Sequence, residues 1–458
     1  MNRTAYPRVL LAGTASSTGK TTMTCAVLAG LRAMGTRVCA FKCGPDYIDP
    51  MFHSRVVGVP SRNLDLFMGG GDTARFVLGR QAEHSDLAVL EGVMGLFDGK
   101  YPDSDEYSSN HVARFTGTPT VLVVNVGSLN YSAVALIRGF RDQGENTISG
   151  VLLNQCSRDR YSGLKEVIER ELGLPVYGFL PRLPGAEISS RHLGLLTADE
   201  VRDLENKIRI LKEAALDCID LKGLVRLSGQ ARELSWPVLW EKTERPSFVR
   251  IGVARDRAFC FYYQDTLEML EALGAELVEF SPLQDLVLPG NLDGLILGGG
   301  YPEEYACQLA ENRGFLEDLK KKTAQGIPVL AECGGFMVLL ETMAGRDGIP
   351  YPMAGVLSGK SFMTGRLNRF GYVELSALAD NLLCRKGETL RGHEFHFSDS
   401  SNNGQDFRAG ENRQSRLCIH AGDSLVAGYP HLYLAGKPEA GRRFLEACLV
   451  WRKRCQGC

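Results

Sequence analysis

The first half of the chain takes its fold from Gly13-Thr-Ala-Ser-Ser-Thr-Gly-Lys-Thr-Thr22, a stretch that lies between two periodic segments. The apolar run Arg8-Val-Leu-Leu-Ala12 precedes it and predicts a buried strand, and residues 21–34 have the pattern of a helix. A glycine-containing turn of this kind points backbone N–H groups and the positive end of a helix at an anion. Lys20 adds a cation for terminal phosphates, and the Thr21 hydroxyl suits Mg²⁺. The stretch therefore predicts a loop that binds a nucleoside triphosphate.

The spacing within this loop departs from the common phosphate-loop pattern. Thr14 occupies the position where the first glycine is expected, and Gly13 lies one residue earlier, as in the dethiobiotin-synthetase-like branch of these proteins. We expect ATP to be the nucleotide. The predicted nucleotide-binding residues are Gly13, Thr14, Ser17, Thr18, Gly19, Lys20, Thr21, Thr22, Lys42 and Asn154.

Acidic residues follow two other apolar runs. Asp46 and Asp49 come after Val38-Cys-Ala-Phe41, and Glu91 ends the run that begins at Leu87. The carboxyl ends of parallel strands meet at one edge of a sheet, so these carboxylates should lie near the phosphates. Carboxylate and hydroxyl oxygens are the ligands that Mg²⁺ prefers. The sequence thus predicts a magnesium site built from Thr21, Asp46 and Glu91.

Composition narrows the class of protein. Of 458 residues, 44% are hydrophobic and 23% charged, the balance of a globular protein. The net charge of −2 gives no footprint for nucleic acid or a membrane surface, so neither is expected as a partner. No apolar stretch approaches the roughly 20 residues that span a bilayer, and the start of the chain is no secretory signal. We expect a cytoplasmic protein.

Strand-length apolar runs alternate with helical patterns twice along the chain, which favours two α/β domains with parallel sheets. The second series begins at Arg250-Ile-Gly-Val-Ala254, and residues 307–325 predict one of its helices. Between the series, residues 221–248 lose this periodicity and carry two prolines near their end. We predict a synthetase domain over 1–235, a linker over 236–248, a second domain over 249–451 and a tail over 452–458.

The second domain contains a candidate nucleophile, Cys333. It follows the apolar run Ile327-Pro-Val-Leu-Ala331 and precedes a helical stretch, which predicts a sharp elbow with the thiol at a helix N-terminus, where its pKa should be lowered. His431 lies downstream as a candidate base. Backbone N–H groups could stabilise an oxyanion at Gly299, Gly300 and Gly334. These features predict a glutamine-hydrolysing cysteine site, which releases ammonia from L-glutamine.

Motifs along nearly the whole chain resemble the cobyrinate a,c-diamide synthase family. Two are highly specific: Gly44-Pro-Asp-Tyr-Ile-Asp-Pro-Met-Phe-His53 and Ala258-Phe-Cys-Phe-Tyr-Tyr263. The others are Glu91-Gly-Val-Met-Gly95, Arg191-His-Leu-Gly-Leu195, Gly298-Gly-Gly-Tyr-Pro-Glu303, Ala331-Glu-Cys-Gly-Gly335 and Gly392-His-Glu-Phe-His396.

The resemblance implies a dethiobiotin-synthetase-like ATP domain followed by a class I glutaminase domain. It implies that ammonia amidates the a and c acetate carboxylates of a corrinoid through acyl phosphates. By similarity Asp46, Asp49 and Glu91 would serve substrate activation or metal binding. Tyr47, Ile48 and Asp98 would contact the macrocycle. The oligomeric state is left open, with a homodimer as one assembly.

The sequence departs from the family pattern at the glutaminase end, and two alternative functions are open. The family's glutaminase end commonly reads Tyr-x-His-x-His, whereas Tyr433 fills the last position here, so a carboxylate partner for His431 is not expected. Nickel-sirohydrochlorin a,c-diamide synthases share these motifs, so that tetrapyrrole is an alternative substrate. A different class is a P-loop ATPase switch whose glutaminase-like domain only binds. His393 and His396 are interpreted as a structural or substrate-facing pair rather than as metal ligands.

Overall fold

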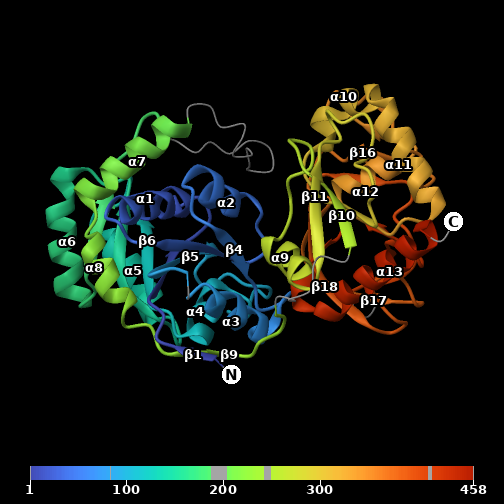
Figure 1. The fold of residues 1–458 in the computed structure, drawn as a ribbon. Coiled ribbons are helices and arrows are strands. Elements are labelled where there is room, and N and C mark those ends of the chain that lie inside the picture. Colours follow the sequence, from blue (N-terminus) through green and yellow to red (C-terminus); the bar gives the residue numbers. More distant parts are fainter. Residues whose placement is uncertain (1, 83, 187–203, 242–248, 411–414, 457–458) are drawn as a thin grey trace. The chain divides into compact units, whose positions relative to one another are not determined.

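The computed structural model describes residues 2–82, 84–186, 204–241, 249–410 and 415–456. It divides the chain into two compact units (Figure 1). Unit 1 comprises Met1–Leu66 and Gly70–Val238, and unit 2 comprises Phe67–Gly69 and Leu239–Cys458. The family-like motif at residues 191–195 lies outside the described residues. No helix among the described residues is long and apolar enough to cross a membrane.

Unit 1 is built on a seven-stranded sheet in which every neighbouring pair is parallel. Continuous apolar runs such as Val121–Val124 are fully buried, as expected for strands covered on both faces. In spatial order the strands are β4 (Ser61–Leu64), β3 (Val38–Cys43), β5 (Leu87–Gly95), β2 (Arg8–Gly13), β6 (Thr120–Asn125), β7 (Ile148–Asn154) and β8 (Val176–Leu180). The central strand, β2, leads into the predicted phosphate loop.

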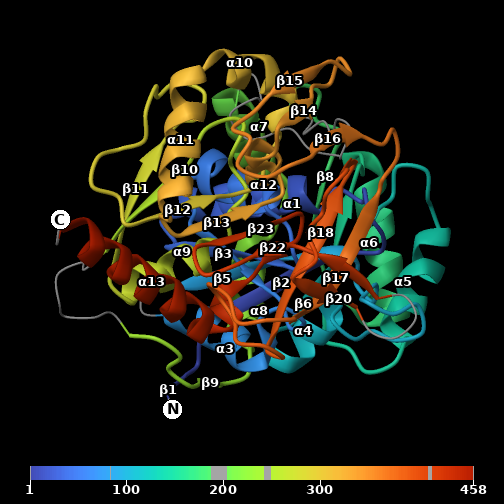
Figure 2. The ribbon, with the colours of Figure 1, turned by 90° about the vertical axis from the view of Figure 1, so that its right-hand side faces the viewer.

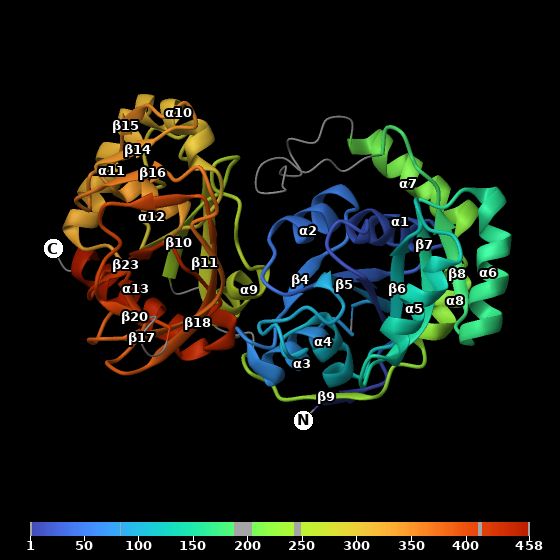
Figure 3. The ribbon, with the colours of Figure 1, turned by 180° about the vertical axis from the view of Figure 1, so that it is seen from behind.

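Helices cover both faces of this sheet. Figures 1 and 3 show α1 and α7 on one side of the strands and α3 and α4 on the other. The helices are α1 (Lys20–Ala33), α2 (Ile48–Met51), α3 (Gly70–Arg80), α4 (Ser109–Thr116), α5 (Ser132–Asp142), α6 (Arg158–Leu172), α7 (Leu204–Cys218) and α8 (Leu221–Ser228). A π-helical turn, Phe52–Val56, follows α2.

The stretch 221–248 is more regular than its sequence suggests. Residues 221–228 form α8, whose N-cap Asp220 accepts a hydrogen bond from the backbone N–H of Gly223. The run that follows contains β9 (Leu234–Trp236), which pairs antiparallel with β1 (Asn2–Thr4). A strand of three residues is too short to show a period of two in the sequence. Its partner also lies more than 200 residues away, so no local pattern indicates the pairing. The predicted linker 236–248 therefore begins inside β9, and its residues 242–248 lie outside the described part.

Unit 2 contains a six-stranded sheet that is parallel except at one edge, shown in Figure 2. Its order is β11 (Ala275–Phe280), β10 (Val249–Ala254), β12 (Gly294–Leu297), β13 (Val329–Glu332), β23 (Leu425–Gly428) and β22 (His420–Ala421). The helices are α9 (Gln264–Ala272), α10 (Ala306–Glu311), α11 (Arg313–Gln325), α12 (Gly334–Leu339) and α13 (Pro438–Gln456), with 3-10 turns at Pro302–Tyr305 and Leu434–Gly436. The predicted fold class, two α/β domains, is confirmed.

The helix predicted over 307–325 is two helices, α10 and α11, that meet at Asn312. The Asn312 side chain accepts a hydrogen bond from the backbone N–H of Phe315 and so caps α11. Its amide also donates to the backbone carbonyls of Pro282 and Asp285, which fixes the break. Apolar periodicity continues across a break of this kind, so the sequence pattern does not reveal it.

Two further sheets in unit 2, one antiparallel and one mixed, were not predicted. One has the order β21 (Arg416–Cys418), β20 (Phe407–Ala409), β17 (Arg369–Ala377), β18 (Thr389–His396) and β24 (His431–Leu432). The other has the order β15 (Pro350–Pro352), β14 (Thr342–Ala344), β16 (Lys360–Met363) and β19 (Ser398–Ser400). Most of these strands are too short or too mixed in polarity to show a clear period of two. The first sheet matters for function because β24 carries His431.

Candidate active sites

The phosphate loop of unit 1 connects Gly13, the last residue of β2, to Lys20, the first residue of α1. Gly19 caps the helix with φ of 87°, a left-handed conformation that favours glycine. A Cβ atom on Gly19 would also lie 2.1 Å from Nδ2 of Asn154. That Nδ2 donates to the backbone carbonyl of Thr18 at 2.8 Å, so Asn154 braces the loop itself.

Lys20 is held against the loop. Its Nζ donates to the carbonyl of Ala15 at 2.8 Å, and the side chain is buried. Burial, with repulsion from Lys42 in second place, lowers the pKa of Lys20 to about 8. A bound triphosphate would place negative charge beside Lys20 and so favour its protonated form.

Behind the loop, Lys42 gathers the predicted acidic residues into one cluster. Its Nζ donates to Asp49 and, at 3.1 Å, to Oε1 of Glu91, and it lies 3.8 Å from Oδ2 of Asp46. Burial opposes the charge on Lys42, but these carboxylates outweigh it and hold its pKa well above the usual value. Burial, followed by the charges of Asp46 and Glu91, raises the pKa of Asp49. One buried ammonium group therefore balances the charge of several carboxylates in this cluster.

The predicted magnesium ligands are only partly brought together. The Thr21 Oγ1 atom lies 2.7 Å from Oε1 of Glu91 and 3.1 Å from Oδ1 of Asp49. Adjacent oxygens of an octahedral Mg²⁺ site are about 3 Å apart, given bond lengths near 2.1 Å. The three oxygens therefore fit one Mg²⁺ ion together with phosphate and water ligands. Among the described residues, no group of three or more His, Cys, Asp or Glu side chains could hold a metal alone.

Asp46 has a different setting from the one expected. Its Oδ1 accepts hydrogen bonds from the backbone N–H groups of Ile48 and Asp49, at 2.9 and 3.2 Å. It therefore starts the short helix α2 and fixes the turn that carries Tyr47 and Ile48. Tyr47 and Ile48 are buried in this structure. The geometry thus makes Asp49, rather than Asp46, the neighbour of Thr21.

His53 completes this site and was given no role from the sequence. It is fully buried, with Nε2 2.8 Å from Oε2 of Glu91 and Nδ1 3.1 Å from Oγ of Ser61. Despite burial, which opposes the charge, Lys42 and then His53 hold the pKa of Glu91 below its usual range. The only signal in the sequence was that His53 ends the family-like motif beginning at Gly44.

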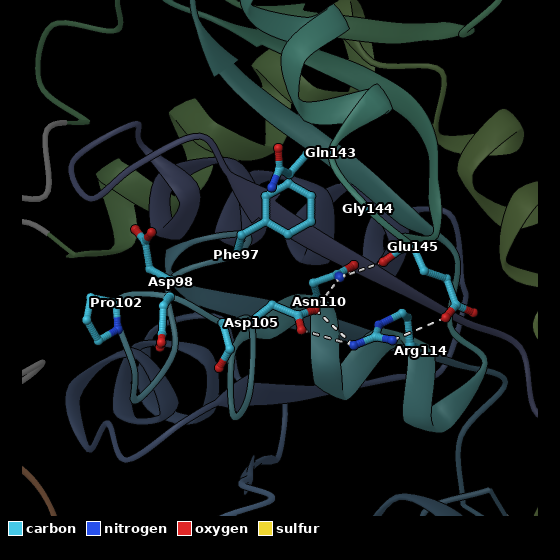
Figure 4. Close-up of a pocket in the computed structure, with 11 residues that line it drawn as sticks. Phe97, Asp98, Pro102, Asp105, Asn110, Arg114, Gln143, Gly144 and Glu145 are labelled. Atoms are coloured by element: carbon cyan, nitrogen blue, oxygen red, sulfur yellow. Dashed lines mark hydrogen bonds and ion pairs between the residues drawn. The ribbon is translucent and has the colours of Figure 1, made fainter.

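Asp98 lies at the edge of a pocket of about 430 Å³ (Figure 4). One carboxylate oxygen accepts the backbone N–H of Gly95 at 2.9 Å, which fixes the end of β5. Farther along the pocket, Arg114 is paired with Asp105 and Glu145. Asp103 also lines it, so the pocket lining contains four carboxylates and one guanidinium. That charge disfavours a polycarboxylate ligand in the pocket unless a cation accompanies it.

The second site, in unit 2, centres on Cys333. This residue joins β13 to α12 with φ of 48°, a strained value for a residue with a Cβ atom. Its backbone N–H donates to the carbonyl of Gly428 at 2.8 Å, which holds the elbow against β23. Burial, followed by the charge of Glu303, raises the pKa of the thiol well above its usual value. The expected lowering of this pKa is therefore wrong for the free protein, because burial dominates.

The predicted oxyanion residues lie beside this elbow. Gly300 has φ of 155°, and a Cβ atom there would lie 2.1 Å from the carbonyl oxygen of Ala258. A Cβ atom on Gly334 would lie 3.4 Å from the backbone nitrogen of Gly300, so the two backbones approach closely. A Cβ atom on Gly299 would lie 2.3 Å from Cε1 of His431. Residues 298–300, here called the glycine turn, therefore lie against both the Cys333 elbow and the candidate base, His431.

His431 lies on β24, paired in register with His393 on β18. Its Nδ1 is 3.7 Å from Oε2 of Glu332, the residue immediately before Cys333. Burial lowers the pKa of His431 to about 3 and raises that of Glu332 to about 8. A carboxylate therefore lies near the base after all, supplied from another strand.

His393 and His396 pack against neighbouring rings of the same site. His396 stacks on Tyr429 at 4.2 Å, and its Nδ1 donates to the carbonyl of Ser398 at 2.8 Å. The His393 and His431 rings lie 6.1 Å apart. Both histidines of the pair are buried.

Each of the two units matches a known protein family. Residues 9–196 match the CobQ/CobB/MinD/ParA nucleotide binding domain, and residues 250–439 match the CobB/CobQ-like glutamine amidotransferase domain. The chain is 38% identical to a cobyrinate a,c-diamide synthase from Thermoplasma volcanium over 98% of both chains. It is 39% identical to one from Caldanaerobacter subterraneus, over 96% of this chain and 98% of that one.

A nucleotide-binding unit and a cysteine-centred glutaminase unit on one chain define a glutamine-hydrolysing amidotransferase, which is a carbon–nitrogen ligase. Within that class, the similarity over nearly the full length assigns a family. The chain belongs to the cobyrinate a,c-diamide synthase family.

Proposed function

We propose that the protein amidates the a and c acetate carboxylates of cobyrinic acid, using ATP, Mg²⁺ and glutamine. The observation that carries this proposal is the cluster of Thr21, Asp49 and Glu91 directly behind the phosphate loop. It offers oxygen ligands for Mg²⁺ at the point where the terminal phosphate of ATP would lie. The full-length similarity to cobyrinate a,c-diamide synthases supports the choice of substrate.

At the unit 1 site, a substrate carboxylate oxygen attacks the γ-phosphate of ATP and yields an acyl phosphate and ADP. Lys20 and the loop N–H groups bind the phosphates, and Mg²⁺ supplies charge neutralisation there. Lys42 is placed to balance Asp49 and Glu91 when the cation is absent. Ammonia then attacks the acyl carbon, and inorganic phosphate leaves as the amide forms.

At the unit 2 site, the Cys333 sulfur attacks the side-chain carbonyl of glutamine, and its proton passes to His431. Backbone N–H groups of the glycine turn and of Gly334 stabilise the oxyanion. His431 returns the proton to the leaving nitrogen, which departs as ammonia. Water then hydrolyses the glutamyl thioester and releases glutamate.

The test is mass spectrometry of cobyrinic acid incubated with the protein, ATP, Mg²⁺ and glutamine. Two successive conversions of a carboxylate to a carboxamide are expected. Glutamine hydrolysis without any change in cobyrinic acid would overturn the substrate, and nickel-sirohydrochlorin would be the next tetrapyrrole to incubate.

A second comparison separates an enzyme from a P-loop switch. The Cys333→Ala variant should lose glutamine-dependent amidation and retain it with free ammonium. A switch predicts no glutamine-dependent ammonia release from the unmodified protein. Loss of the ammonium-dependent reaction in a well-folded Cys333→Ala variant would contradict the proposal that glutamine hydrolysis and amidation occur at two separate sites.

A further inference from the structure

Glu332 places a carboxylate beside the candidate base of the glutaminase site. Its Oε2 lies 3.7 Å from Nδ1 of His431, and its Oε1 accepts the backbone N–H of Leu432 at 3.2 Å. One carboxylate thus reaches both the His431 ring and the backbone of the next residue. It can therefore fix the position of His431 on its strand.

Both residues stand on rigid elements. Glu332 ends β13 and pairs in register with Gly428 of β23. His431 pairs with His393 of the antiparallel sheet. Rigid strands on each side keep the distance between the carboxylate and the ring reproducible, which a positioning contact requires.

Tyr433 does not take this role, although class I glutaminases elsewhere carry a glutamate two residues after the base. Its hydroxyl donates to Oδ2 of Asp265 at 3.1 Å. Its ring packs edge-on against Tyr263, with centroids 5.1 Å apart. The side chain at this position is therefore engaged with α9 and the residue before it.

We propose that Glu332 is the positioning residue of the glutaminase site, accepting Nδ1–H of His431 so that Nε2 takes the Cys333 proton. The present 3.7 Å is slightly longer than a hydrogen bond, and such contacts commonly tighten when substrate binds. The step is a proton transfer only: S–H loses its proton, Nε2 gains it, and Nδ1–H stays on the imidazolium. This inference rests on the roles proposed above for Cys333 and His431.

The charge balance of the site supports this role. Burial disfavours an imidazolium at His431 and a thiolate at Cys333, so proton transfer between them needs a nearby anion. The Tyr262 hydroxyl also lies near Glu332, and it stays neutral because burial raises its pKa. After burial, His396 contributes to the lowered pKa of His431, and Glu394 opposes it. Glu394 lies near His431 from β18, where Arg416 already pairs with it.

The test uses Glu332→Gln, measured by glutamate production. Glutamine keeps the size of the side chain, and its amide oxygen can still accept from Leu432. Its NH₂ group, however, faces Nδ1 with a donor and so selects the wrong tautomer. We expect kcat for glutamine hydrolysis to fall at least about tenfold, with KM changed by less than about threefold. Glu332→Asp, which keeps the charge on a shorter arm, should restore part of that loss.

Tyr433→Phe is the matched control, because it removes the polar group at the position where class I glutaminases elsewhere carry the orienting glutamate. It should retain the kcat and the pH profile of the unmodified protein. Wild-type kcat and pH profile in Glu332→Gln would overturn the inference, and a loss confined to Tyr433→Phe would assign the role to Tyr433. Retained glutamine hydrolysis in Cys333→Ala would instead overturn the proposed function. Circular dichroism checks that each variant is folded.

Discussion

Oγ1 of Thr21 lies 2.7 Å from Oε1 of Glu91, although 70 residues separate them in the chain. The contact joins the first turn of α1, the helix that follows β2, to the middle of β5, the strand next to β2 in the parallel sheet. Asp49 approaches the same hydroxyl at 3.1 Å. Three oxygens from three separate segments thus meet beside the phosphate loop, and Lys42 pairs with the two carboxylates among them.

Replacing Lys20 should disable the synthetase reaction alone. Lys20→Ala removes the buried cation that would face the terminal phosphates, so amidation should fall at least about 100-fold with either nitrogen source. Glutamine hydrolysis in the absence of ATP should be retained, because Lys20 lies in the other unit from Cys333. Cys333→Ala is the reciprocal control. Normal amidation by Lys20→Ala would show that the loop does not bind the reacting phosphates.

Asp49 and Asp46 should differ in their effect on Mg²⁺. Asp49→Asn removes a carboxylate that contacts Thr21, so the Mg²⁺ concentration for half-maximal amidation should rise about tenfold. Asp46→Asn keeps an oxygen that can accept from Ile48 and Asp49, and should shift the Mg²⁺ requirement less. The measurement is a Mg²⁺ titration at saturating ATP. An equal shift in both variants would contradict the assignment of Asp49 as the ligand.

A methyl group on Gly299 should displace the base. In Gly299→Ala the new Cβ would lie 2.3 Å from Cε1 of His431, a distance that forces the ring to move. Glutamine hydrolysis should fall about 100-fold or more, while ammonium-dependent amidation persists. Gly422→Ala is the control, since a Cβ there meets nothing within 4 Å. Unchanged glutaminase activity in Gly299→Ala would place the base elsewhere.

Glutamine hydrolysis should rise with pH. Burial raises the pKa of Glu332 to about 8, so its carboxylate form, which stabilises the imidazolium, is present above that pH and lost below it. The kcat/KM for hydrolysis should therefore increase through an apparent pKa near 8 and fall at lower pH. In Glu332→Gln this limb should disappear, leaving a lower and flatter profile. A wild-type profile that is already flat between roughly pH 6 and 9, an interval that contains this pKa, would contradict the assignment.

The element boundaries show which parts of the fold the local sequence pattern can predict. The strands at 120–125, 148–154 and 294–297 each contain a continuous apolar run, such as Val121–Val124, because a buried parallel strand is covered on both faces. The antiparallel sheet and the mixed sheet of unit 2 were not predicted, since their short strands gain stability from partners distant in the chain. The break at Asn312 escaped for a similar reason: its amide bonds to carbonyls of residues 282 and 285.

By itself the sequence determined the two α/β domains, the phosphate loop and the cysteine elbow, because each depends on residues that are neighbours in the chain. Only the tertiary structure decided the partners of those residues. It placed Asp49 rather than Asp46 beside Thr21, His53 against Glu91, and Glu332 beside His431. These contacts join helices and strands that are separate in the chain, so they depend on how the elements pack and on sheet order and register, which no local spacing records.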